Sequence, residues 1–272
     1  MTDELISSAD LLQTETDNQK PETENMEVHH HSHAHGKKTW REYFWEFLML
    51  FLAVFCGFLA EYQLEHVIEH QREKEFINSM ILDLKDDLQT MDKQNQFEIT
   101  GISRLDTLIN LLNDPGLAKA NGDQLYYLAR VGPRMGPLVN NSRTFDQLKN
   151  SGGFRLIRKK EAADRIMGYY SRFPLLRLVE DNYTREFDNY QKTASKVFDP
   201  VTFRKNENKD GNIIRGNENA SLRSYDKELL KELGFYTVYM NGSRRSRLLF
   251  MTQLKQTCEE LIRLLQQQYD TN

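Results

Sequence analysis

The residues best suited to chemistry are two histidines and a glutamate in the stretch HVIEH at 66–70. In zinc-dependent hydrolases with the spacing H-x-x-E-H, two histidines one helical turn apart bind the metal and the glutamate activates water. His66, Glu69 and His70 are therefore a candidate zinc site. Two alternatives stay open: a looser zinc-binding or proton-sensing role, and solvated side chains on a charged helix without a pocket.

A second group of histidines lies near the N-terminus, where five of seven residues are His29, His30, His31, His33 and His35. Neutral imidazole is a common ligand of zinc, nickel and copper, so the tract predicts a loose metal site. The alternative is a tolerated low-complexity tract or part of a cloning tag, because such a stretch offers a metal no fixed geometry. No other cofactor is predicted.

Two basic clusters are candidate anion sites. The first follows the turn at 150–153 and carries four basic residues within 155–160, and the second is SRRSR at 243–247. A helix N-terminus beside the first cluster would favour an anion. Its glycines do not match a phosphate-binding loop, so a corner between two helices with Gly152 as the C-cap is favoured. For the second cluster, a solvated helix face is favoured over a site for an acidic partner or a phosphate.

The composition limits the class of protein. The chain has 272 residues, of which 28% are charged, and its mean hydropathy is −0.67, so any membrane signal is local. The net charge of −4 argues against a nucleic-acid-binding protein, which usually carries a basic excess. The two cysteines, Cys56 and Cys258, would lie in different solvents, so no disulfide between them is predicted. A cysteine-poor outer region is compatible with a bacterial periplasm.

One apolar segment decides the predicted class. Residues 47–60 read FLMLFLAVFCGFLA, fourteen residues without a charge. A hydrocarbon core of about 30 Å needs roughly 20 helical residues. Tyr43, Phe44 and Trp45 extend the run at one end and Tyr62 at the other, in the manner of interfacial aromatic residues. Residues 39–62 are therefore predicted to be a transmembrane anchor.

Three alternatives to a membrane span compete with it. A cleaved signal peptide would begin near residue 1, whereas this run begins more than forty residues later. A lipoprotein site at Cys56 would need a small residue in place of Phe55. A buried helix of a soluble protein normally keeps a polar stripe, and this segment is apolar all round. The membrane span is the favoured interpretation.

Basic residues on one side of the apolar segment predict its orientation in the membrane. Lys37, Lys38 and Arg41 precede it, and no lysine or arginine follows until Arg72. The positive-inside rule then predicts a cytoplasmic N-terminus and an extracytoplasmic domain at 63–272. In a Gram-negative bacterium this means a single-pass inner-membrane protein with a periplasmic domain.

The rest of the chain is predicted to be a tail and a helical region. Residues 1–38 are polar and poor in large apolar residues, which predicts a disordered cytoplasmic tail. Beyond Glu61, residues spaced by four and three predict a long helix of a coiled-coil type, which either continues the membrane helix or follows a single break. This stripe consists of Ile77, Ile81, Leu84, Leu88, Met91, Asn95, Glu98, Ile102, Leu105, Ile109 and Leu112, and Asp114-Pro115-Gly116 follows it.

Proline, glycine and capping residues mark the later helix boundaries. Because no strand alternation is convincing, the fold class is predicted to be all-α, a transmembrane helix continuing into a bundle of long helices. The predicted helices are 122–128, 144–152, 159–173, 175–198, 221–233 and 235–269, with a polar loop at 204–220.

Three strings resemble a known family. They are WREYFWEFLMLFLAVFCGFLAEYQLEH, IEHQREKEFINSMILDLKDDL and TFDQLKNSGGFRLIRKKEAADRIMGYY. They resemble a family of small single-pass membrane proteins of Gram-negative bacteria with no assigned function, over about residues 37–175. The resemblance implies an anchored topology and a helical outer domain, and it brings no catalytic residues with it.

These observations predict a non-enzymatic interaction or scaffold protein of the cell envelope. Its expected partners are the lipid bilayer and another protein or a second copy of the chain, and no nucleic acid. The first alternative is a periplasmic sensory or ligand-binding module that acts through a partner, since the tail carries no signalling domain. The second is a zinc-dependent hydrolase, which depends on His66, Glu69 and His70 alone.

Overall fold

The computed structural model describes residues 39–270 of the chain. The predicted disordered tail at 1–38 lies outside the described residues. The described residues divide into two units, residues 39–58 and residues 59–270. Within the described range the secondary structure is helical apart from loops and one isolated bridge between Glu207 and Ile213. The predicted all-α class is therefore confirmed for this part of the chain.

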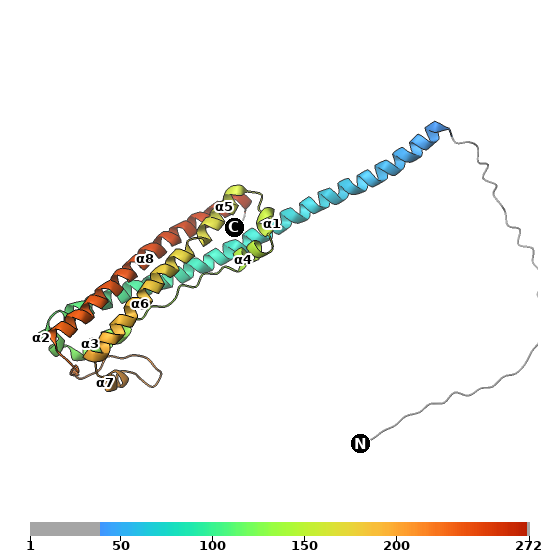
Figure 1. Ribbon diagram of the computed structural model, residues 1–272. Helices are drawn as coiled ribbons and strands as arrows, with labels where there is room; N and C mark the ends of the chain where they lie inside the picture. The colour runs from blue at the N-terminus through green and yellow to red at the C-terminus, as the bar shows by residue number, and fades with distance from the viewer. Residues whose placement is uncertain (1–38, 271–272) are drawn as a thin grey trace, which may run out of the picture. The chain divides into compact units, whose positions relative to one another are not determined.

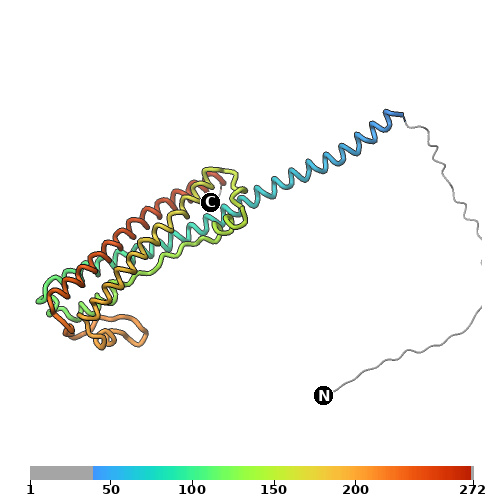
Figure 2. Tube along the Cα trace, viewed as in Figure 1, coloured from blue at the N-terminus to red at the C-terminus, as the bar shows by residue number. Residues whose placement is uncertain are grey.

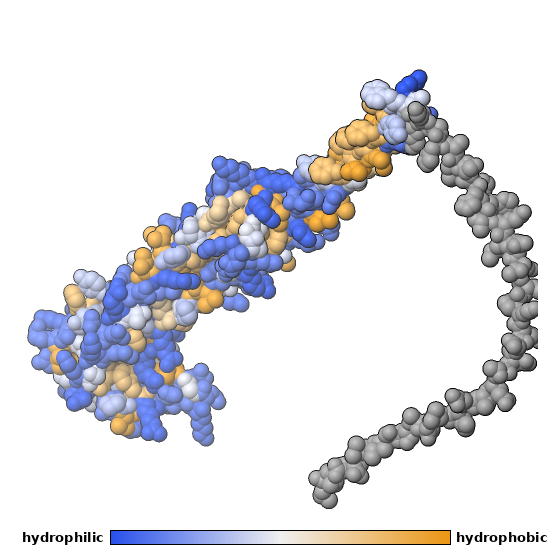
Figure 3. Space-filling view, turned by 45° about the vertical axis from the view of Figure 1, so that its right-hand side comes forward, coloured by the Kyte–Doolittle hydropathy of each residue, from blue (hydrophilic) through white to orange (hydrophobic). Residues whose placement is uncertain are grey.

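The first helix, α1 (Trp40–Leu112), runs without a break (Figure 1). Thr39 caps it, because the Thr39 backbone N–H donates to Glu42 Oε2 at 2.8 Å while its carbonyl oxygen accepts the Glu42 N–H at 2.8 Å. The helix is continuous across residues 61–76, as predicted. Among the described helices, it is the one long and apolar enough to cross a membrane. Figure 3 shows apolar side chains gathered near its N-terminal end.

Eight shorter helical elements follow α1 along the chain. They are α2 (Pro115–Ala120), α3 (Gly122–Val131), α4 (Arg143–Asn150), η1 (Gly153–Leu156), α5 (Lys160–Tyr170), α6 (Phe173–Val197), α7 (Pro200–Lys205) and α8 (Lys227–Tyr269). The element η1 is a single 3₁₀ turn. Between α3 and α4, residues 132–142 form an extended segment that runs along the long helices (Figure 2).

The second unit is built from long helices packed side by side. Helices α6 and α8 are antiparallel and in contact along their length. Side-chain hydrogen bonds fix their register: Thr193 Oγ1 donates to Glu232 Oε1 at 2.9 Å, and Ser243 Oγ donates to Glu186 Oε1 at 3.0 Å. From Ile77 to Leu112, α1 packs against these helices and contributes to both apolar clusters.

Two apolar clusters form the core of the second unit. One joins α1 from Ile77 to Met91 with α5 and with the end of α8 from Leu254. The other joins α1 from Leu105 with α3, with α6 from Tyr183 and with the start of α8 up to Met240. Between the two clusters, α1 and α8 contribute buried charged side chains, which form the candidate site described below.

The structure differs from the predicted helix boundaries in two ways. The helices predicted to finish at Leu112 and Phe198 are followed directly by Asp114-Pro115 and Asp199-Pro200, which begin the unpredicted helices α2 and α7. Each aspartate side chain caps its helix, and each proline suits the first turn. The helices predicted at 221–233 and 235–269 are one helix, α8. It begins after the Asp226 cap and continues through Gly234, whose cost of about 1 kcal/mol the packing outweighs.

Candidate functional site

Acidic residues occupy the buried face of α1. Buried residues recur along α1 with the spacing of four and three, and Glu73, Asp87 and Glu98 lie on this stripe beside the apolar residues. Together with Asp83 they are at most 3% exposed. A buried carboxylate without partners is strongly unfavourable, so each of these groups needs hydrogen-bond donors or a cation nearby. The donors come from α8, from the extended segment, from α4 and α5, and from the backbone N–H of Arg158.

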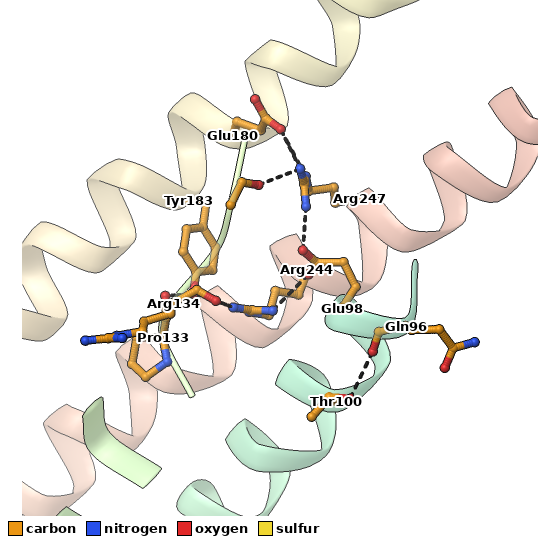
Figure 4. A network of polar contacts seen from close by, with 10 residues as sticks. Gln96, Glu98, Thr100, Pro133, Arg134, Glu180, Tyr183, Arg244 and Arg247 are labelled. Carbon is orange, nitrogen blue, oxygen red and sulfur yellow. Dashed lines mark hydrogen bonds and ion pairs between the residues drawn. The ribbon is translucent and has the colours of Figure 1, made fainter. Parts of the chain in front are cut away.

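Glu98 lies at the centre of a buried ion network (Figure 4). Arg244 Nη1 donates to Glu98 Oε2 at 3.0 Å, and Arg247 Nη1 donates to Glu98 Oε1. These three side chains are 0% exposed. Arg247 Nη2 also lies 2.8 Å from Oε1 of Glu180, which accepts the backbone N–H of Leu138 at 3.2 Å. The network therefore joins α1, α6 and α8 between the two apolar clusters.

The same arginines hold the extended segment at 132–142. Arg244 Nη2 donates to the carbonyl oxygen of Arg134, and Arg247 Nη2 donates to that of Gly136 at 2.8 Å. The segment is neither helical nor paired in a sheet, so its backbone groups must find other partners. The buried guanidinium groups supply them, and so fix the path of this segment over the helices.

Two neighbours fix the position of Arg244. Its Nε donates to the Tyr183 hydroxyl at 3.3 Å, and that hydroxyl donates to the carbonyl oxygen of Pro133 at 2.5 Å. Burial raises the pKa of Tyr183 to about 12, so the hydroxyl keeps its proton at neutral pH. On α1, Gly101 makes room for the guanidinium, since a Cβ at this position would lie 2.0 Å from Arg244 Nη1.

The chemistry open to these buried groups is limited. Both oxygens of Glu98 are occupied by guanidinium donors and have no contact with solvent, so no acceptor is left for a substrate. Burial raises the pKa of the Cys258 thiol to about 12, which leaves it protonated, and its Sγ donates to the Leu84 carbonyl oxygen at 3.4 Å. The arrangement is suited to holding helices and the extended segment together.

Asp83 and Asp87 hold the chain where it enters α4. Asp87 Oδ1 accepts the backbone N–H of Asn141 at 2.6 Å, and Oδ2 accepts the Tyr169 hydroxyl at 2.7 Å. Asp83 Oδ2 accepts the backbone N–H and the hydroxyl of Thr144 at 2.9 and 2.7 Å. Carboxylates of α1 therefore fix the end of the extended segment directly.

Asp87 makes the stability of the protein depend on pH. Burial raises its pKa to about 6, although hydrogen bonds from Asn141 and Tyr169 oppose the rise. A carboxyl whose pKa is raised on folding binds its proton more tightly in the folded state. The contribution of this group to the free energy of unfolding therefore increases as the pH is lowered from about 7 to about 4. The rise in the pKa of Asp87 from 3.8 to about 6 corresponds to a change of roughly 3 kcal/mol in the free energy of unfolding.

The Asp87→Asn variant should lack this pH-dependent contribution to stability, because asparagine does not titrate. Its side chain still offers an oxygen to the Asn141 N–H. Urea unfolding of the full chain at a series of pH values measures it. We subtract the free energy of unfolding of the variant from that of the wild type. This difference should increase by about 2–3 kcal/mol when the pH is lowered from 7 to 4. A constant difference across this range would show that Asp87 does not titrate in it.

The histidines of HVIEH lie beside an arginine. Arg158 Nη2 is 3.4 Å from His66 Nδ1 and 3.4 Å from Glu69 Oε2. The side chains of His66 and His70 are 41% and 52% exposed. Within residues 39–270, no group of three or more His, Cys, Asp or Glu side chains is arranged to hold a metal ion. Zinc binding at this motif stays a prediction, and the histidine tract at 29–35 lies outside the described residues.

The interpretation of 243–247 as a solvated helix face is wrong for two of its arginines. Arg244 and Arg247 are fully buried, and only Arg245 is exposed, at 57%. Buried residues of α8 recur with the spacing of three and four, and both arginines fall on this stripe. This periodicity is the signal in the sequence that places them in the core, where Glu98 neutralises part of their charge.

The turn at 150–153 agrees with the predicted corner between helices. Helix α4 ends at Asn150, and Gly152 has a φ of 67°, the left-handed conformation that favours glycine after a helix. Leu148 and Ile157 on either side of the turn are buried in the first apolar cluster. These contacts give the turn a structural role.

Comparisons of the chain with protein-family models, with curated proteins and with solved structures found no match. The buried network explains how the second unit is held together, and the exposed apolar end of α1 and the surface of the second unit remain to be explained.

Proposed function

We propose that the protein is a non-enzymatic, membrane-anchored interaction protein of a Gram-negative inner membrane. In this proposal, the N-terminus is cytoplasmic and residues 63–272 form a periplasmic scaffold that binds another envelope protein or a second copy of the chain. The observation that carries the proposal is α1, in which an exposed apolar segment continues as one helix into the buried stripe of the second unit. The resemblance to single-pass membrane proteins supports the same topology.

The surface and interior of the second unit support an interaction role. Its buried carboxylates are engaged with backbone groups and arginines, which suits a fixed scaffold. On the outer face of α8, Phe235, Val238 and Tyr239 are each more than half exposed, and the rings of Phe235 and Tyr239 lie 4.8 Å apart. Aromatic residues are enriched in protein interfaces.

Arginines in the apolar segment should release the protein from the membrane. Phe51 and Val54 are exposed apolar residues near the middle of the segment. Each arginine at the centre of a span costs about 2.5–3.5 kcal/mol on insertion, so the double variant Phe51→Arg/Val54→Arg should lose at least about 5 kcal/mol. Alkaline carbonate extraction of membranes, followed by immunoblotting of pellet and supernatant, measures the loss of the anchored form.

Leu82→Arg is the matched control. Leu82 belongs to the same helix and is 64% exposed, but it lies in the second unit, so its replacement should leave the protein in the membrane pellet. Extraction of the wild type by carbonate would contradict the anchor. A wild type that stays in the pellet but resists protease added to spheroplasts would contradict the periplasmic location.

The scaffold role predicts a complex larger than one chain. The chain has a mass of 32.1 kDa. After purification from its native membrane in a mild detergent, we expect light scattering to give a protein mass equal to two or more chains or to one chain plus a stoichiometric partner. A mass of one chain alone at native expression levels would contradict this proposal.

A further inference from the structure

A pocket of about 720 Å³ opens between α3, α6 and α7. Its volume is in the usual range for sites that bind small molecules. Aromatic side chains make up much of its apolar lining: Phe187, Tyr190, Phe198 and Phe203. The ring centroids of Phe198 and Phe203 lie 5.1 Å apart, and both belong to a group of aromatic rings centred on Tyr126. Phe187 and Phe203 are partly exposed and can contact the ring of a ligand, whereas Tyr190 and Phe198 are almost fully buried.

The rim of the pocket carries a local excess of positive charge. Four arginines line it, at positions 130, 134, 204 and 223, against one acidic residue, Glu207. Glu207 is already paired with Arg130 at 3.1 Å, and Arg223 Nη1 donates to the Ser195 carbonyl oxygen at 3.4 Å. This concentration of arginines contrasts with the chain as a whole, whose net charge is −4.

Two of these guanidinium groups have no partner among the described residues. Arg134 and Arg204 are exposed, and the structure gives their side chains neither a hydrogen bond nor an ion pair within residues 39–270. In Figure 4 the Arg134 guanidinium points away from Glu98 and Arg244. Planar guanidinium groups bind carboxylate, sulfonate and phosphate oxygens, often through two hydrogen bonds.

The buried network helps to place one of these arginines. The Arg134 carbonyl oxygen accepts a hydrogen bond from Arg244, and Tyr183 donates to the carbonyl oxygen of Pro133. The backbone on which Arg134 stands is therefore fixed from within the bundle, while its side chain remains available at the pocket. A fixed backbone lowers the entropy lost when the guanidinium binds a ligand.

We propose that this pocket binds a small aromatic anion, with its ring on the aromatic lining and its carboxylate, sulfonate or phosphate at Arg134 and Arg204. The combination of an apolar lining and an unpaired cationic rim selects an amphipathic ligand over a neutral ring or a bare anion. This inference goes beyond the scaffold role and does not depend on it. The two proposals can fail separately. Binding of the anion by a chain that forms no complex would support the pocket alone, and a complex that binds no anion would support the scaffold alone.

Calorimetric titration of the full chain in nanodiscs of zwitterionic lipid tests the proposal, with empty nanodiscs as the reference. The probes are naphthalene-2-sulfonate, its neutral counterpart 2-naphthalenemethanol, inorganic sulfate, and decanoate as an anion with an aliphatic body. We expect the naphthalenesulfonate to bind, and each of the other three to bind at least about tenfold more weakly. No binding of the naphthalenesulfonate, or equal binding of any of the other three, would overturn the proposal.

The variants Arg134→Gln and Arg204→Gln locate the site. Each should weaken naphthalenesulfonate binding by about tenfold while leaving the melting temperature unchanged, because neither side chain has a partner to lose. Arg177→Gln is the matched control, since Arg177 is an exposed arginine on α6 outside the pocket. A third variant, Ser195→Trp, fills the pocket and keeps the four arginines, and it should abolish binding. Unchanged affinity in all three pocket variants would place the bound anion elsewhere.

Discussion

Replacing Glu98 with alanine is expected to lower the free energy of unfolding by about 3–5 kcal/mol. The substitution leaves Arg244 buried without an anionic partner and leaves Arg247 with Glu180 alone. The dehydration of the two guanidinium groups remains, while the carboxylate that offset it is gone. For a domain of this size, the loss corresponds to a fall in melting temperature of roughly 6–20 °C. Circular dichroism of the full chain in nanodiscs during heating measures it.

Asp92→Ala is the matched control for Glu98→Ala. Asp92 also belongs to α1 and pairs with Lys255 of α8 at 2.6 Å, but the two side chains are 58% and 30% exposed. Solvent screens such a pair, so its removal should cost at most about 1 kcal/mol. Glu98→Gln, which keeps an acceptor oxygen and loses the charge, should fall between the two. A loss for Glu98→Ala no larger than that for Asp92→Ala would contradict the role assigned to the buried network.

Local sequence signals predicted most of the helices but not all of their starts. The long apolar stripes predicted α1 and the second half of α8, and the left-handed Gly152 was expected from its place after α4. The same kind of signal was incomplete at Asp114-Pro115 and Asp199-Pro200. An aspartate followed by a proline both ends one helix and caps the next, and the short helices α2 and α7 are too brief to show a periodicity.

The candidate site was only partly open to prediction. The sequence places Glu98 on the predicted stripe of α1, and Arg244 and Arg247 in a basic cluster. Continuing the spacing of three and four back along α8 would have placed both arginines in the core. Their pairing with Glu98 depends on the register between two helices that are far apart in the sequence, and periodicity within one helix does not determine that register.

Local sequence patterns do not predict the pocket. Arg130, Arg134, Arg204 and Arg223 come from α3, the extended segment, α7 and the loop before α8, and they meet only because these parts of the chain converge. The extended segment itself has no periodicity, since side chains of other elements satisfy its backbone groups. Its glycines and prolines disfavour a regular helix, while its path depends on Arg244 and Arg247, which lie over a hundred residues later.

Gly101 is the position on α1 where the smallest substitution should have a large effect. A Cβ at Gly101 would lie 2.0 Å from Arg244 Nη1 and 2.6 Å from its Cζ. Arg244 is 0% exposed and bonded to Glu98, Tyr183 and the Arg134 carbonyl oxygen, so it cannot move aside without breaking these bonds. We therefore expect Gly101→Ala to destabilise the protein by at least about 2 kcal/mol, although alanine is the better helix former by about 1 kcal/mol.

Gly242→Ala separates the packing effect from helix propensity. Gly242 lies within α8 and is exposed, and a Cβ there would meet nothing within 4 Å, so alanine should stabilise the protein by about 0.5–1 kcal/mol. Urea unfolding of the full chain in nanodiscs compares the two variants. In an Arg244→Met background, the cost of Gly101→Ala should largely disappear, because the guanidinium that it meets is absent. If Gly101→Ala instead stabilises the protein as Gly242→Ala does, Arg244 does not occupy the space beside α1.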